Sequence, residues 1–124
     1  MATSTRDVIE GLLRAFERKD MEAIMACFAD DAVVYDPHYP TPEMRGKDAI
    51  RQNFTWGFSM IQQPGFTIRN AWVGDTSGAV EVDTHHTFPN GAEVRFPQVF
   101  VLETEGGLLT RLQAYAPYPP PPPA

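Results

Sequence analysis

The sequence predicts an α+β fold in which three N-terminal helices pack on a curved, mostly antiparallel sheet and form a cone with an internal pocket. Three observations support this class. Apolar residues recur at helical spacing in three segments before residue 62, and they alternate with polar residues in four segments after residue 65. Turn-forming runs such as "PNG" and "EGG" separate the alternating segments. Helices grouped first and hairpins grouped after them are typical of α+β proteins.

Three segments have the spacing of amphipathic helices. The first runs from Ser4 to Lys19, and Ser4 is its expected N-cap. Asp20 caps a second, shorter helix, which the run "FADDA" at residues 28–32 is expected to end. The third helix extends from about Lys47 to Ile61, because Gln63-Pro64-Gly65 breaks the pattern. These helices would form one layer of the fold.

The sheet is predicted from one short strand and four longer ones. The short strand is Val33–Asp36, and Pro37 keeps Asp36 extended because the residue before a proline disfavours helical geometry. The segment "PHYPTPEMRG" contains three prolines and is expected to be an irregular loop. The four longer strands form an antiparallel meander and are expected at Phe66–Val73, Ala79–Phe88, Glu93–Thr104 and Leu108–Ala116.

Alternation along these strands predicts which side chains face the pocket, since successive side chains point to opposite faces. In the first meander strand one face carries Phe66, Ile68, Asn70 and Trp72. In the second strand, the register of Val80, Val82, Thr84 and Phe88 places His86 on the inner face. A bulge would select His85 instead.

The chain of 124 residues is expected to form one domain over residues 1–116, followed by a Pro-rich extended tail at residues 117–124. The tail "PYPPPPPA" cannot join a sheet, because proline has no N–H to donate. A disordered terminus is the favoured interpretation. Recognition of the tail by a peptide-binding domain is the alternative.

Composition excludes several classes of partner. The formal net charge of −6 argues against nucleic acid and against an anionic membrane surface. The lone Cys27 cannot form an internal disulfide, and the N-terminal residues contain no apolar run long enough for a signal peptide. We therefore expect a cytoplasmic protein. No Gly-rich phosphate loop or metal-binding motif is present, so we expect no cofactor and no metal.

The order of elements, together with "RKDMEAIMACFADDAVVYDP", resembles the nuclear transport factor 2-like superfamily, and within it the SnoaL-like and ketosteroid-isomerase-like branch. The resemblance covers roughly residues 5–116. It implies the cone fold and makes Asp36, in the strand-end Asp-Pro, the general base. The tyrosine and aspartate that stabilise the enolate in ketosteroid isomerases fall at about Leu12 and near Phe100, so these donors are missing here.

A different catalytic pair remains. Some dehydratases of this superfamily use an aspartate on the first strand with a histidine on the meander, and this chain has Asp36 and the run "THHT" that contains His86. His38, two residues after Asp36, is the third candidate. Tyr35, Gln98 and Asn70 are candidate hydrogen-bond donors to a developing charge. The full set of expected ligand contacts is Tyr35, Phe16, Phe54, Phe58, Asn70, Trp72, Thr84, Phe88, Phe96, Gln98, Phe100 and Leu112.

Two functions are consistent with these residues. The first is a cofactor-independent acid–base enzyme, an isomerase, dehydratase or cyclase, that acts on a small, largely apolar carbonyl or hydroxyl compound. The alternative is a non-catalytic ligand-binding or dimeric assembly module, which the missing enolate donors favour. In both cases we expect a homodimer through the outer face of the sheet, on or near which lie Arg69, Val73, Arg95, Val99, Val101, Arg111 and Tyr115.

Overall fold

The computed structural model describes residues 4–122; residues 1–3 and 123–124, the outer ends of the predicted domain and tail, lie outside the described part. The described helices are α1 (Thr5–Glu17), α2 (Met21–Met25) and α3 (Lys47–Met60). None of these three helices has the length and apolar character needed to cross a membrane. The strands are β1 (Phe28–Tyr35), β2 (Glu43–Arg45), β3 (Phe66–Val73), β4 (Ser77–Thr87), β5 (Glu93–Glu105) and β6 (Leu108–Tyr115). The predicted α+β class with three helices is confirmed.

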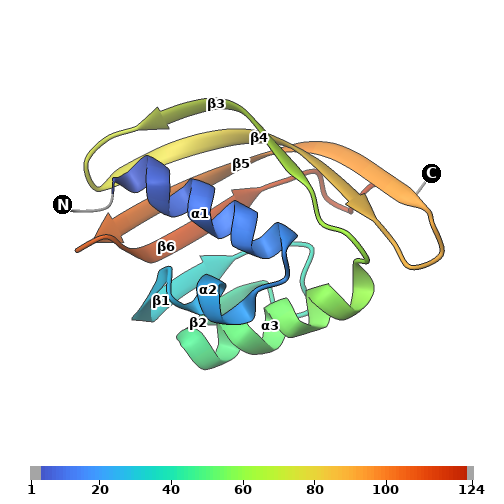
Figure 1. Ribbon diagram of the computed structural model, residues 1–124, viewed down its shortest axis with the longest axis horizontal. Helices are drawn as coiled ribbons and strands as arrows, with labels where there is room; N and C mark the ends of the chain where they lie inside the picture. The colour runs from blue at the N-terminus through green and yellow to red at the C-terminus, as the bar shows by residue number, and fades with distance from the viewer. Residues whose placement is uncertain (1–3, 123–124) are drawn as a thin grey trace.

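One sheet contains all six strands, in the order β2-β1-β6-β5-β4-β3. β1 and β6 pair in parallel, and every other neighbouring pair is antiparallel. In Figure 1 the long strands β3 to β6 curve over α1, whereas α3 lies against β1 and β2. The helices therefore cover the inner face of the sheet, and side chains on that face are shielded from water.

Capping side chains fix the starts of the first two helices. The side-chain oxygen of Ser4 accepts a hydrogen bond from the Asp7 backbone N–H, and that of Asp20 accepts one from the Ala23 N–H, both at 3.1 Å. These are the caps that the sequence predicts. α3 instead follows Gly46, whose φ of 84° lies in the left-handed region that glycine tolerates.

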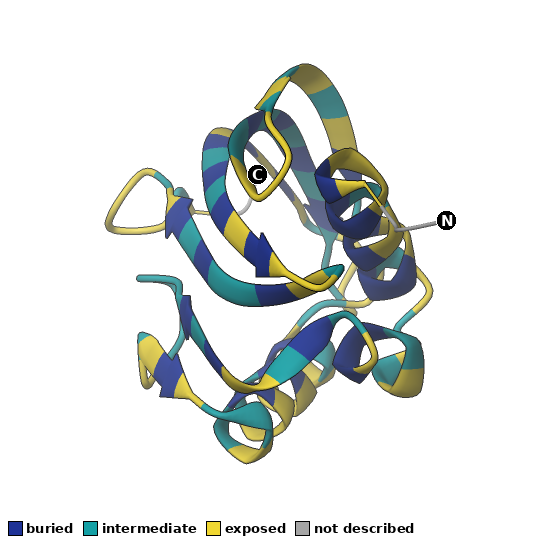
Figure 2. Cartoon of the chain, turned by 90° about the vertical axis from the view of Figure 1, so that its left-hand side faces the viewer, coloured by how far each residue is buried: buried dark blue, intermediate teal, exposed yellow. Residues whose placement is uncertain are grey.

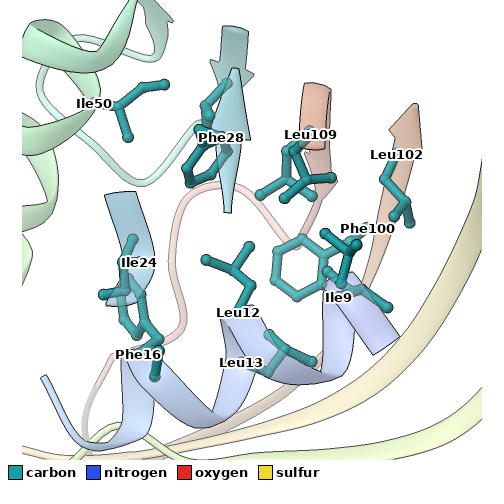
Figure 3. Close-up of a cluster of buried hydrophobic side chains, with 14 of the residues drawn as sticks. Ile9, Leu12, Leu13, Phe16, Ile24, Phe28, Ile50, Phe100, Leu102 and Leu109 are labelled. Atoms are coloured by element: carbon teal, nitrogen blue, oxygen red, sulfur yellow. The ribbon is translucent and has the colours of Figure 1, made fainter. Parts of the chain in front are cut away.

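The hydrophobic core lies between the helices and the inner face of the sheet. Buried and more exposed residues alternate along β4 and β5, as Figure 2 shows. Apolar side chains from both helical and strand segments meet in one cluster, drawn in Figure 3. Its labelled members are Ile9, Leu12, Leu13, Phe16, Ile24, Phe28, Ile50, Phe100, Leu102 and Leu109.

Two local predictions are wrong around β1. The run "FADDA" does not end the second helix, because α2 stops at Met25 and Phe28 already belongs to β1. Phe28 pairs with Leu109 of the parallel strand β6, a partner that is remote in sequence. The predicted loop after β1 also contains a short strand, β2, in which Met44 pairs with Val34 and is fully buried.

The prediction of which β3 side chains face inward is also wrong after Ile68. The pairing of β3 with β4 shifts by one residue between Ile68 and Asn70, and such a bulge reverses the faces of the residues that follow. Asn70 is therefore exposed and donates a hydrogen bond to Glu81 at 2.7 Å, and Trp72 is 60% exposed. Ala71 packs against the core in their place. Asn70 and Trp72 face outward, not inward as strict alternation predicts.

Candidate active site

A cavity of about 390 Å³ lies between the helices and the inner face of the sheet. The three candidate catalytic residues, Asp36, His38 and His86, all line it. So do eight of the predicted ligand contacts: Phe16, Tyr35, Phe54, Phe88, Phe96, Gln98, Phe100 and Leu112. The fold thus brings residues from α1, α3, the end of β1 and the meander to one enclosed space.

Two predicted contacts lie one layer behind the wall. The ring of Phe58 packs against that of Phe16, with centroids 4.7 Å apart. Thr84 is fully buried, and its hydroxyl accepts a hydrogen bond from the side-chain amide of Gln98 at 2.6 Å. These two residues support the lining without contributing to it. The remaining two predicted contacts are the outward-facing residues of β3 described above.

Asp36 directly follows β1 and is held by its own loop. Its Oδ1 accepts a hydrogen bond from the backbone N–H of His38 at 2.9 Å, and its backbone N–H donates to the carbonyl of Pro42 at 3.0 Å. Burial raises the pKa of the Asp36 carboxyl above its ordinary value of 3.8, although the His38 hydrogen bond and charge oppose the rise. Asp36 therefore binds a proton more readily than an exposed aspartate does.

His86 projects from β4 into the cavity and is only 9% exposed. Its Nδ1 accepts a hydrogen bond from the backbone N–H of Gly65 at 3.3 Å. Burial, with smaller contributions from the charges of His38 and His85, lowers the pKa of His86 to about 4. The ring is therefore neutral near pH 7, and its single proton is on Nε2. His85 lies on the opposite face and contacts Glu93 at 2.7 Å.

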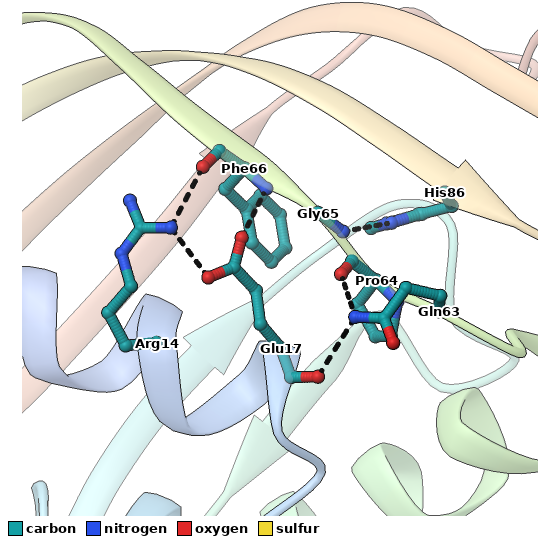
Figure 4. Close-up of polar contacts among 7 residues, drawn as sticks. All are labelled: Arg14, Glu17, Gln63, Pro64, Gly65, Phe66 and His86. Carbon is teal, nitrogen blue, oxygen red and sulfur yellow. Dashed lines mark hydrogen bonds and ion pairs between the residues drawn. The ribbon is translucent and has the colours of Figure 1, made fainter.

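Hydrogen bonds from residues at the end of α1 hold the segment that carries Gly65, as Figure 4 shows. Glu17 accepts a hydrogen bond from the backbone N–H of Phe66 at 2.9 Å, and Arg14 donates one to the Phe66 carbonyl at 3.2 Å. The side chain of Gln63 donates to the Glu17 carbonyl at 3.1 Å. These contacts satisfy the backbone N–H and C=O of Phe66 at the start of β3 and hold the peptide next to Gly65, the hydrogen-bond partner of His86.

His38 sits at the rim of the cavity. Its ring meets that of Phe96 edge to face, with centroids 5.2 Å apart. Its Nε2 lies 2.7 Å from the backbone carbonyl oxygen of Pro117. Because a carbonyl can only accept, Nε2 is the donor in this contact. The ring nitrogen of His38 is thus already engaged by the C-terminal segment.

Tyr39 is a lining residue that the sequence does not single out. Burial, and to a lesser extent the charge of Asp36, raise the pKa of its hydroxyl above the ordinary value of 10.0, so the hydroxyl stays protonated. A Cβ at Gly57 would meet this hydroxyl at 2.9 Å, so α3 approaches Tyr39 closely only because Gly57 has no side chain. Tyr39 lies in a Pro-rich loop without periodicity, and its closeness to Asp36 in the sequence is the one signal for it.

The described lining of the cavity contains a single acidic side chain. Asp36 is the only carboxylate among the described lining residues, which include no lysine or arginine. Within residues 4–122, no three His, Cys, Asp or Glu side chains come close enough together to hold a metal ion. The lining thus combines one carboxylate and a few neutral hydrogen-bonding groups with a mainly apolar wall.

Comparison with known proteins gives a family match and a large set of similar folds. The family model described as a SnoaL-like domain matches residues 9–112. No curated protein sequence matches the chain significantly. Among solved structures, a Catenulispora acidiphila protein with a ketosteroid isomerase-like fold, crystallised with trimethylamine, has a TM-score of 0.79 and 22% identity, and the match covers 91% of this chain and 86% of that one.

Two further structures show the range of this fold. A Shewanella denitrificans protein named as a putative SnoaL-like polyketide cyclase has a TM-score of 0.80 and 15% identity, with 91% of this chain and 90% of that chain covered. An epoxide hydrolase from M. tuberculosis has a TM-score of 0.75 and 18% identity, with 89% and 80% covered. At these identities the likeness establishes the fold and leaves the reaction open.

Proposed function

The chain belongs to the SnoaL-like domain family, and on this basis we propose that it catalyses proton transfer on a small, largely apolar carbonyl or hydroxyl compound bound in the cone-shaped cavity, without an organic cofactor. Isomerisation, dehydration and aldol-type cyclisation all begin with removal of a proton from the carbon next to a carbonyl. Members of the fold named as polyketide cyclase and epoxide hydrolase are consistent with such small-molecule chemistry.

One observation carries the proposal: a partly buried carboxylate, Asp36, and the neutral imidazole N–H of His86 line the same apolar cavity. Burial raises the pKa of Asp36, which moves a carboxylate toward the range in which a general base works near neutral pH. The pKa of His86 is lowered to about 4, so its Nε2–H is available as a donor over the whole neutral range. Each group has a backbone hydrogen bond that offsets the cost of its burial, from His38 to Asp36 and from Gly65 to His86.

The proposed reaction moves one proton and one electron pair. Asp36 takes a proton from the carbon next to the substrate carbonyl; the electron pair of that C–H bond forms a carbon–carbon double bond, and the π pair of the carbonyl moves to its oxygen. The Nε2–H of His86 stabilises the resulting enolate oxygen by a hydrogen bond. The carbonyl then re-forms: protonated Asp36 returns its proton to a conjugated carbon, which gives isomerisation, or to a hydroxyl on the next carbon whose C–O bond breaks as water leaves, which gives dehydration.

The Tyr39 hydroxyl and the absence of lysine and arginine from the described lining indicate which ligands the cavity favours. The Tyr39 hydroxyl remains protonated and is a second donor available for the developing charge, whereas one of the two amide N–H groups of Gln98 is already bonded to Thr84. The described lining has no lysine or arginine to pair with a carboxylate or phosphate on the ligand. The preferred substrate is therefore neutral and mainly apolar.

Solvent deuterium exchange tests this function with model ketones in place of the natural substrate. A panel of cyclic and aryl ketones is incubated with the protein in D₂O, and deuterium at the carbon next to the carbonyl is measured by NMR. We expect enzyme-dependent exchange for at least one ketone, lost in Asp36→Asn. It should be retained in Asp83→Asn, a carboxylate on the exposed face that pairs with Arg69 at 2.6 Å. Equal rates with and without protein would overturn the function.

A non-catalytic binding module is the second candidate. It is favoured by the proline residues of the C-terminal segment, which line the same cavity and leave it partly closed. Saturable binding of ketones, measured by NMR or thermal shift, without exchange in any member of the panel, would support this role.

We also propose that two copies associate through the outer face of the sheet. Ala79 on β4 pairs with Trp72 on one side and with Val101 on the other, so these three residues form one row across the sheet. Val99 on β5 pairs with Tyr115 on β6. Trp72 is 60% and Tyr115 56% exposed, so this face has large apolar side chains that a second copy could cover. Sedimentation equilibrium should give a dimer for the wild-type chain and a monomer for Val101→Asp.

A further inference from the structure

The C-terminal segment after β6 takes part in the cavity. Pro120, Pro121 and Pro122 are among the residues that line it. A run of prolines has no backbone N–H groups, so the segment cannot be held by pairing with a strand. Its outer side remains in water, since only Pro121 among these three is partly buried. The segment therefore lies along the mouth with one side toward the cavity and the other toward solvent.

One hydrogen bond anchors this segment. The Nε2–H of His38 donates to the carbonyl oxygen of Pro117 at 2.7 Å, and within residues 4–122 no other hydrogen bond reaches residues 117–122. The His38 ring also packs edge to face on Phe96, a lining residue. The backbone N–H of His38 donates to Asp36 Oδ1. A single residue thus contacts the segment, the cavity wall and the carboxylate.

We propose that residues 117–122 are a removable wall of the ligand site, that His38 is the latch that holds this wall, and that the wall selects the ligands which the cavity retains. The identity of those ligands rests on the function proposed above. His38 is then a positioning residue for the wall. The segment is displaced when a ligand enters and closes again on the bound molecule, because it has a single polar anchor and no strand pairing.

The chemistry of the wall favours one class of ligand. Proline rings offer apolar C–H surface and no hydrogen-bond donor, so the closed wall adds contact area and excludes water from Asp36. It offers no cation and no hydrogen-bond donor to an anionic group. Neutral aryl or alicyclic ketones that reach from Asp36 to the mouth should gain from it, whereas very small ketones that do not touch the prolines should not.

Binding of 6-propionyl-2-(dimethylamino)naphthalene, a neutral fluorescent aryl ketone, tests the wall. In a chain that ends at Ala116 we expect the dissociation constant to rise by about tenfold or more, as loss of apolar contact predicts. His38→Phe keeps a ring beside Phe96 but lacks the N–H, and it should raise the dissociation rate. His85→Phe, changed on the outer face, should do neither. An unchanged or tighter dissociation constant in the shortened chain would overturn the proposal.

Two further experiments cover the cases in which the shortened chain does not fold or the fluorescent ketone does not bind. If the shortened chain does not fold, the triple change of Pro120, Pro121 and Pro122 to Ser replaces it with the same expected result. Nuclear Overhauser contacts between these proline rings and the lining aromatic rings are expected in the free protein, and their absence would overturn the proposal even if the fluorescent ketone does not bind. Asp36→Asn should still bind the ketone even if it does not catalyse exchange. The wall can therefore be tested by binding alone, whether or not the proposed catalysis is found.

Discussion

The backbone N–H of Gly65 donates a hydrogen bond to Nδ1 of His86, and this contact determines which imidazole nitrogen carries the proton. A nitrogen that accepts cannot also carry a hydrogen, so neutral His86 has its proton on Nε2. With a pKa of about 4 the ring stays neutral near pH 7. The contact therefore favours His86 as a hydrogen-bond donor to a ligand oxygen over the role of proton relay.

The lowered pKa of His86 predicts a loss of stability in acid. The imidazole pKa is about 4 in the native state and 6.5 in the unfolded chain, so between these values the unfolded state binds more protons. The free energy of unfolding should therefore fall as the pH is lowered from 6.5 toward 4, by up to about 3 kcal/mol. Urea denaturation across this pH range measures the fall.

The difference between wild type and His86→Gln isolates this effect. Asp36 acts in the opposite direction, because its raised native pKa makes the native state bind more protons than the unfolded chain in acid. His86→Gln should remove the imidazole contribution, whereas His85→Gln, on the exposed face, should retain it. The same pH dependence in wild type and His86→Gln would contradict this assignment.

Loss of the hydrogen bond between Glu17 and the Phe66 N–H is predicted to change the His86 tautomer. In Glu17→Ala the Phe66 N–H loses its acceptor, so the neighbouring peptide at Gly65 is less firmly placed and the Nδ1–H form of His86 should become populated. The ¹⁵N chemical shifts of the imidazole measure the two tautomers. Glu10→Ala is the control, since Glu10 pairs with Arg6 on the exposed side of α1. A single unchanged tautomer in Glu17→Ala would refute the positioning role.

Gly65 itself should tolerate no side chain. A Cβ at this position would meet the backbone carbonyl oxygen of His85 at 2.7 Å, and backbone cannot move aside cheaply. Gly65→Ala should therefore lower the free energy of unfolding by about 1–3 kcal/mol. Gly11 on α1 has open space around it, so Gly11→Ala should raise the free energy of unfolding by up to about 1 kcal/mol. Urea denaturation of both variants checks the pair, and equal effects would be inconsistent with the close approach.

Local chemistry in the sequence predicts much of this fold. The caps at Ser4 and Asp20 are visible because a short polar side chain before an apolar periodic run binds the free N–H groups of the first turn. The inward position of His86 follows from the regular alternation along β4, which pairs with β5 without a shift. The place of Asp36 follows from Pro37 and from the resemblance to the SnoaL-like family.

Long-range contacts account for what the sequence does not predict. Phe28 lies in β1 because it pairs with Leu109 on β6, a contact that no local pattern shows. Trp72 faces outward because the pairing of β3 with β4 shifts by one residue after Ile68, a feature that no local pattern shows. The proline segment lines the cavity through one carbonyl contact with His38, and its composition alone is equally typical of a free tail.

A ¹³C NMR titration of the Asp36 side-chain carboxyl, with and without bound aryl ketone, tests most directly the claim that this partly buried carboxylate is a base inside the ligand cavity. We predict a midpoint above the ordinary value of 3.8 in the free protein and a further upward shift when the ketone excludes water. A midpoint at or below 3.8 that does not respond to the ketone would contradict the claim.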